Sequence, residues 1–254
     1  MATYETDAIV LRAIRYSEAD SILTLYTRDR GRASAIAKGA RRPRSRLGAR
    51  LQPGTCGRFM LAEGRGDLAT VRGVGSFQPN AGLWAASGRL RAAGSVLEAA
   101  YRTLPEQDPN EPAYHLLDNA LVLIAREPPP EGPPRLDPFV LGVHVKLLVV
   151  AGLLPVLGSC ARCGAGPPLP AFSAVAGGAL CPGCADGADP FSPATHAALA
   201  GLIGRPLSEA REACPSDAAP GVERVVGLVL REHLGVTLRS ASPSGMWETS
   251  RAGH

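Results

Sequence analysis

The first 78 residues show the pattern of short β-strands joined by turns. Runs rich in β-branched and aromatic residues alternate with segments rich in Gly, Asp and Glu, which is typical of strands bounded by turns. Asp29-Arg30-Gly31 predicts a hairpin between two of these runs. The predicted strands are 6–14, 21–27, 32–37, 57–61 and 68–74. Five short strands predict a small barrel or sandwich, and a five-stranded barrel of this length is what an OB-fold requires.

After residue 79 the apolar positions recur at three- and four-residue steps, which predicts α-helices. Asn110 and Asp137 are expected to cap two of them, because each is followed by a proline in the first turn. The predicted helices are 80–103, one that begins after Asn110, one from Asp137 through about Leu154, and two near 193–203 and 219–233.

Two observations favour a protein that is neither membrane-bound nor secreted. The longest apolar run, 139–157, has His144 and Lys146 in its middle, so we interpret it as a buried helix rather than a membrane span. The N-terminus has no basic start and no early apolar stretch, so no secretory signal is expected. We predict a cytoplasmic protein with reduced cysteines and no membrane partner.

Together these patterns predict an α+β protein. An N-terminal OB-fold β-barrel is followed by an α-helical domain with an inserted four-cysteine zinc ribbon. The tail after Ser240 is rich in Ser, Gly and Pro without periodicity, and we predict that it is disordered. The predicted divisions are 1–78 for the barrel, 79–157 for the first part of the helical domain, 158–187 for the ribbon, 188–240 for the second helical part and 241–254 for the tail.

The strongest chemical signal is a set of four cysteines. Cys160 and Cys163 form one C-x2-C pair, and Cys181 and Cys184 form another after seventeen intervening residues. Each pair makes a tight turn whose two thiolates point the same way, and two such turns supply the four corners of a zinc tetrahedron. We expect one structural zinc ion per chain. Four cysteines leave no open position for a catalytic water. A redox-active C-x-x-C pair and a pair of turns without metal are the alternatives.

The net charge of +4 hides an asymmetry. Residues 1–80 carry 14 basic and 7 acidic residues, whereas the remainder carries 13 basic and 16 acidic residues. The excess is concentrated in the segment 38–50, the basic loop, which has six positive charges and no acid. Such a segment cannot enter a core without a large desolvation cost, so it lies in solvent or against a polyanion. Its glycines and Pro43 predict an extended, adaptable loop.

A basic groove combined with aromatic platforms is how such barrels bind single strands of nucleic acid. Tyr16, next to Arg15 and close to Arg12, is the best candidate for stacking on a base. By contrast, Arg162 is the only basic residue between Cys160 and Cys184, so DNA contact by the ribbon is expected to be minor. The predicted DNA-binding residues are Arg12, Arg15, Tyr16, Lys38, Arg41, Arg42, Arg44 and Arg46.

Several segments together resemble a known family. They are 6–12 (TDAIVLR), 16–20 (YSEAD), 25–27 (LYT) with Gly31, 37–42 (AKGARR) with Ser45, 51–54 (LQPG) and 234–240. These segments and the four cysteines resemble the bacterial DNA repair family RecO, many of whose members carry a zinc site. The resemblance spans residues 4–240 and singles out Lys38, Arg41 and Arg42 as the foremost DNA contacts.

The resemblance implies a nucleoid-associated mediator of recombinational repair. Such a protein binds single- and double-stranded DNA and anneals complementary strands. It acts with RecR and often RecF, engages the C-terminal tail of single-strand binding protein, and helps RecA load onto coated DNA. The residues that would bind that tail are unknown. Arg126, Arg135 and Lys146 are candidates for the basic rim of a peptide pocket.

Nothing in the sequence indicates an enzyme, because it contains no P-loop, GxSxG or HExxH motif. The alternative to a DNA-binding mediator is an adaptor that works mainly through protein contacts, with incidental DNA binding.

Overall fold

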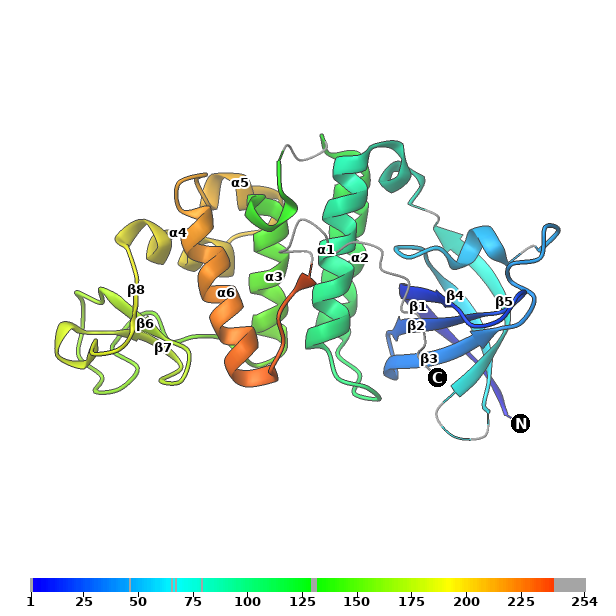
Figure 1. Ribbon diagram of the computed structural model, residues 1–254, viewed down its shortest axis with the longest axis horizontal. Helices are drawn as coiled ribbons and strands as arrows, with labels where there is room; N and C mark the ends of the chain where they lie inside the picture. Colours follow the sequence, from blue (N-terminus) through cyan, green and yellow to red (C-terminus); the bar gives the residue numbers. More distant parts are fainter. Residues whose placement is uncertain are drawn as a thin grey trace. The chain divides into compact units, whose positions relative to one another are not determined.

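The computed structural model describes residues 2–45, 47–64, 66, 68–78, 80–128 and 132–239. It has an α+β fold with two compact units (Figure 1). One unit contains a β-barrel and two α-helices, and the other contains four α-helices and a small sheet. The predicted fold class is thus confirmed, whereas the five-part division into domains stays a prediction. The predicted disordered tail, 241–254, lies outside the described residues.

The barrel consists of the five strands that the sequence predicts. They close in the order β1-β2-β3-β5-β4, and β4 pairs back onto β1. The strands are β1 (Thr3–Arg15), β2 (Ser21–Thr27), β3 (Gly31–Ala37), β4 (Cys56–Ala62) and β5 (Leu68–Gln78). All contacts between neighbours are antiparallel except that of β3 with β5, which is parallel. This closed five-stranded barrel confirms the predicted OB-fold.

Closure depends on β1, the longest strand. Its residues 3–9 pair with β4 and its residues 8–15 pair with β2. Between Val10 and Arg12 the register with β2 shifts by one residue, so Leu11 forms a bulge. Bulges increase the local twist and bend a strand. This bend allows β1 to pair with β4 along its first part and with β2 along its second part. The barrel interior is filled by aliphatic side chains such as Val10 and Leu25 and by the aromatic ring of Phe59.

Two helices complete this unit, α1 (Ser87–Thr103) and α2 (Glu111–Arg126), which lie side by side (Figure 1). The predicted cap is present, because the Asn110 side chain accepts a hydrogen bond of 2.9 Å from the Ala113 N–H. The connection between the helices lies against the start of β3, where the Gln107 N–H donates to the Arg32 carbonyl at 3.1 Å. The helices therefore pack on the outside of the barrel.

The second unit begins with α3 (Pro138–Val150), which is buried on nearly all sides. The Asp137 carboxylate accepts hydrogen bonds from the N–H groups of Phe139 and Val140, as predicted for a cap. The helix ends four residues before the predicted Leu154, because Gly152 adopts a left-handed conformation (φ +74°) and the Leu153 N–H returns to the Leu148 carbonyl. Among the described residues no helix is long and apolar enough to cross a membrane.

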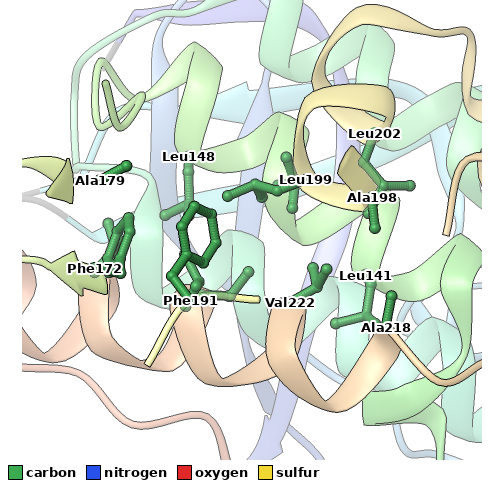
Figure 2. Packing of buried hydrophobic residues seen from close by; sticks show 14 of the residues in the cluster. Leu141, Leu148, Phe172, Ala179, Phe191, Ala198, Leu199, Leu202, Ala218 and Val222 are labelled. Carbon is green, nitrogen blue, oxygen red and sulfur yellow. The ribbon is translucent and has the colours of Figure 1, made fainter. Parts of the chain in front are cut away.

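The remaining elements surround α3. The predicted helices near 193–203 and 219–233 are α4 (Pro193–Gly204) and α6 (Ala219–Leu234), and a short helix, α5 (Ala210–Ala213), was not predicted. A three-stranded sheet consists of β6 (Ala171–Ser173), β7 (Gly178–Leu180) and β8 (Asp189–Pro190). Figure 2 shows Phe191 between Phe172 of the sheet and side chains of the helices such as Leu199. The small sheet and the helices thus share one hydrophobic core.

A matched pair of glycine substitutions tests the packing of the first unit. Gly31 and Gly66 both have left-handed backbones (φ +68° and +76°), but a Cβ at Gly31 would lie 2.3 Å from the Asp108 carbonyl oxygen, whereas one at Gly66 meets no atom within 4 Å. We expect Gly66→Ala to lower the free energy of unfolding by about 1 kcal/mol. Gly31→Ala is expected to lower it by about 1–3 kcal/mol more. Denaturant unfolding measures both, and equal losses would contradict the packing of the helix connection on β3.

Candidate metal centre and nucleic-acid interface

The four predicted cysteine ligands come together in the second unit. Their sulfur atoms all lie within 4.8 Å of one another. Cys160 and Cys163 belong to a turn that precedes the small sheet, and Cys181 and Cys184 follow β7 directly. Cys160 is buried and Cys163 is exposed, so the cluster lies at the surface with one sulfur anchored inside.

Short backbone hydrogen bonds shape both turns. In the first, the Gly164 N–H donates to the Cys160 carbonyl at 2.8 Å, and Gly164 has a φ of +78° that favours glycine. In the second, the Cys184 N–H donates to the Cys181 carbonyl at 3.0 Å. The Arg162 guanidinium joins the turns by donating to the Cys184 carbonyl at 3.2 Å. The one basic residue of the ribbon therefore has a structural contact, which the sequence did not predict.

The spacing of the sulfurs fits a tetrahedral metal. With zinc–sulfur bonds of about 2.3 Å, the edge of an ideal tetrahedron is about 3.8 Å. The sulfurs of Cys163 and Cys181 are 3.7 Å apart, which is much longer than the roughly 2.05 Å of a disulfide bond. All six cysteines are free thiols. Four thiolates at these distances could hold one metal ion, and this donor set is that of structural zinc sites.

The electrostatics of the cluster also favour a cation. Hydrogen bonds from backbone N–H groups, first that of Cys181, lower the pKa of Cys160 to about 6. The Cys163 sulfur, together with burial, raises the pKa of Cys184. Cys160 therefore loses its proton more readily than its neighbours, and its negative charge disfavours further thiolates beside it. A bound cation offsets this repulsion, because its positive charge stabilises all four thiolates at once.

The basic loop lies in the first unit, between β3 and β4. Lys38, Arg41, Arg42 and Arg44 are exposed on it. The loop is not the extended segment that we predicted, because Ala40, Leu47 and Leu51 pack on the barrel core. Apolar anchors on both sides therefore hold its charged side chains in solvent. Arg46 lies outside the described residues.

The basic loop is joined to the loop between β1 and β2. The Arg41 N–H donates to the Ala19 carbonyl at 2.9 Å, and its guanidinium donates to the Ser17 carbonyl at 2.8 Å. The Gly39 N–H donates to the Asp20 carboxylate at 2.8 Å. These bonds place Arg41 beside the loop that carries Tyr16, whose side chain is 64% exposed.

The cations of this unit differ in their partners. Four arginines, which lie on β3, on β4 and in the turn between β2 and β3, form ion pairs with acidic residues. These are Arg28 with Glu111, Arg30 with Glu63, Arg32 with Glu106 and Arg58 with Asp7. In contrast, Lys38, Arg41, Arg42 and Arg44 have no acidic partner among the described residues. Their positive charge remains available to a polyanion.

The structure separates two of the predicted DNA contacts. Arg15 lies on the same face of β1 as Ala13, at the end of the barrel that carries Tyr16 and the basic loop. Arg12 lies on the other face, with its guanidinium 5.7 Å from the centre of the Tyr101 ring of α1. Arg12 is therefore not brought together with the loop residues.

Arg50, at the end of the basic loop, has a structural contact instead. Its guanidinium donates to the Val74 carbonyl at 2.9 Å and lies 4.6 Å from the centre of the Phe77 ring. It ties the loop to β5. Of the loop cations, Arg50 is thus the one most fully engaged by the barrel.

Comparisons with known proteins agree with these features. The model of the family "Recombination protein O N terminal" matches residues 1–79, and that of "Recombination protein O C terminal" matches residues 87–242. A protein named DNA repair protein RecO from Rubrobacter xylanophilus is 38% identical over 240 residues, with 92% of each chain covered. Proteins of the same name from Anaeromyxobacter sp. strain K (36% identical, 89% of this chain and 90% of the relative) and Desulforudis audaxviator (38%, 88% of each) are also similar.

Replacement of one metal ligand tests the centre. We expect one zinc ion per chain in the unsubstituted protein and loss of that zinc in Cys160→Ser. Because the sheet shares its core with the helices, this loss is expected to lower the stability of the second unit by more than about 4 kcal/mol, while affinity for DNA falls less. Elemental analysis and thermal unfolding measure the two effects. Cys214→Ala, at a buried cysteine outside the cluster, is the control and should retain its zinc. Lost DNA binding at intact stability would contradict this assignment.

Proposed function

Because the chain belongs to the RecO family, which acts in DNA repair and recombination, we propose that it is a non-enzymatic mediator that binds single- and double-stranded DNA and anneals complementary strands. The observation that carries the proposal is the set of exposed cations of the basic loop that lack acidic partners. Annealing requires no covalent chemistry. It requires a surface that neutralises the phosphates of two strands while their bases exchange partners.

We assign the phosphate contacts to Lys38, Arg41, Arg42 and Arg44. The apolar anchors of the loop support this assignment, because they hold these side chains in solvent before DNA arrives and so reduce the ordering cost of binding. Each cation that meets a phosphate releases counterions, and release adds to affinity without reading sequence. Arg15 extends the same end of the barrel, whereas Arg12 contacts α1 and is a weaker assignment.

The partners follow from the family rather than from any one contact. The proposed mediator acts with RecR, and often RecF, and engages the C-terminal tail of single-strand binding protein so that RecA can load onto coated DNA in the cytoplasm. Two of the residues suggested for the edge of a pocket that binds this tail have partners within the chain. The Arg135 guanidinium lies 3.8 Å from the Glu223 carboxylate, and the Lys146 ammonium donates to the Ile203 carbonyl at 3.3 Å. Burial lowers the pKa of Lys146. These contacts leave the peptide site unassigned.

We assign zinc to the four-cysteine cluster, where it has a structural role. It would hold the two turns of the ribbon together and so maintain the core that the ribbon shares with α3 and α6. We assign DNA binding and strand annealing to the first unit.

Removal of the loop charges tests the proposed interface. The triple variant Lys38→Ala, Arg41→Ala, Arg42→Ala is expected to anneal complementary oligonucleotides more slowly and to lower the slope of log affinity against log salt by about 2 on single-stranded DNA, since each lost contact removes about 0.7. The control is a second triple variant, Arg126→Ala, Arg205→Ala, Arg231→Ala. It removes the same number of positive charges from exposed arginines outside the basic loop. Unchanged annealing and an unchanged slope in the loop variant would refute the assigned site.

Substitution of Tyr16 tests base stacking. Tyr16→Ala is expected to weaken binding to single-stranded DNA about 5- to 100-fold, because stacking on an aromatic ring contributes about 1–3 kcal/mol per base. Tyr16→Phe retains the ring and should bind as the unsubstituted protein does. Fluorescence anisotropy with single-stranded and duplex probes measures both variants. Duplex binding is expected to change little, since its bases are already stacked. An equal loss on the two probes would argue against stacking.

A further inference from the structure

A hollow of about 280 Å³ opens at the end of the barrel, next to the basic loop. Its walls come from β1, β2 and both arms of the loop. The lining residues are Ala13, Ser21, Leu23, Ala40, Arg41, Gly48, Leu51 and Gln52. Most of the lining is apolar, and a few polar groups interrupt it, which is the usual composition of a small-ligand site.

The shape of the hollow is fixed by close backbone packing. Ala40 and Leu51 are buried and belong to the barrel core. Between them the loop folds back, so that a Cβ added to Gly48 would lie 2.8 Å from the Ala40 carbonyl oxygen. Only glycine permits the two arms of the loop to approach this closely. The hollow is therefore a built feature of the folded loop.

Polar groups lie in the wall and at the mouth. Ser21 is 9% exposed, and the alternation of β2 places its side chain on the same inner face as Leu23. Its hydroxyl has no hydrogen-bond partner in the part of the chain that the structure describes, so it can bond to a ligand in the hollow that it lines. The Arg41 guanidinium is held beside the hollow by the Ser17 carbonyl. The Gln52 side chain donates to the Gly48 carbonyl at 3.3 Å, which leaves its amide oxygen as an acceptor.

The size of the hollow suits one flat ring system. A volume of 280 Å³ lies just below the range of about 300–1,000 Å³ that is typical of small-ligand sites, so the hollow is large enough for a single nucleobase. The mouth is bordered by Arg41 of the basic loop, so a strand whose phosphates lie on that loop would bring its bases to the opening.

We propose that this hollow binds one unstacked nucleobase of a single DNA strand whose phosphates lie on the basic loop. The base edge hydrogen-bonds to Ser21, Gln52 and Arg41, and its faces contact the apolar wall. A paired base cannot enter, because its edge is occupied and it is stacked on both sides. The hollow thus distinguishes single strands from duplex, whereas the loop charges do not. This inference rests on the proposed function, since it requires a strand on the loop.

The test fills the hollow without removing any charge. Ala13→Leu places a larger side chain in the wall from half-buried Ala13 of β1, and Ala81→Leu makes the same change at an exposed position of the same unit. Full-length, zinc-loaded proteins are titrated with a labelled oligothymidine and with a strand of equal length in which alternate nucleotides are abasic. The two probes carry the same phosphates and differ only in bases.

We expect Ala13→Leu to bind the intact strand about 5- to 100-fold more weakly, with unchanged affinity for the abasic strand and an unchanged salt slope. Ala81→Leu is expected to bind both strands like the unsubstituted protein. Wild-type affinity of Ala13→Leu for the intact strand would overturn the proposal, and so would an equal loss on both strands.

A second variant covers the case in which Ala13→Leu does not fold. Ser21→Ala keeps the volume of the hollow and removes only the unpartnered hydroxyl, so it is expected to weaken binding of the intact strand about 5-fold. Unchanged binding by a folded Ser21→Ala would then overturn the proposal. A flat salt response of the unsubstituted protein would instead refute the proposed function, so the two failures are distinguishable.

Discussion

The double pairing of β1 is the constraint on which the first unit depends. One strand pairs with β4 along its first part and with β2 along its second. The bulge at Leu11 makes this possible, because it bends the strand where it passes from one neighbour to the other. The antiparallel pairing of β2 with both β1 and β3 brings the end of β1 and the end of β3 to the same rim of the barrel. Tyr16 and the basic loop meet there although more than twenty residues separate them.

The distribution of charge around the barrel follows from a competition between partners. On the wall, Arg58 and Asp7 form two hydrogen bonds of 3.0 Å, and the Arg58 guanidinium holds the pKa of Asp7 below its usual range. A phosphate would have to displace that carboxylate. At the rim the loop cations have no acidic partner among the described residues, so a phosphate displaces only water and mobile ions. The net charge of the unit therefore understates the difference between its wall and its rim.

The sequence predicts those features that depend on local signals. The five strands, the caps at Asn110 and Asp137 and the four cysteines all follow from residue types at short spacing. The orientation of Arg12 does not, because the bulge at Leu11 reverses the alternation of β1 and turns Arg12 toward Tyr101. The early end of α3 depends on one left-handed glycine, Gly152, in a chain rich in glycine. The hollow could not be predicted, since its walls come from three segments that only the closed barrel assembles.

The proposed annealing activity requires that single strands be held and also released, and the two kinds of contact proposed at the rim would meet these demands differently. Phosphate contacts are insensitive to pairing, so they keep both strands near the surface throughout. A base held in the hollow is unavailable for pairing, and its binding competes directly with the duplex. The hollow offers few hydrogen-bonding groups, and one of them, Arg41, is already engaged by Ser17. Such a site holds a base weakly, so a complementary strand, which offers stacking and pairing together, can withdraw it. The proposed hollow would therefore favour unpaired DNA, because only an unpaired base can enter it. It would also permit release of the paired product, because it binds a base weakly.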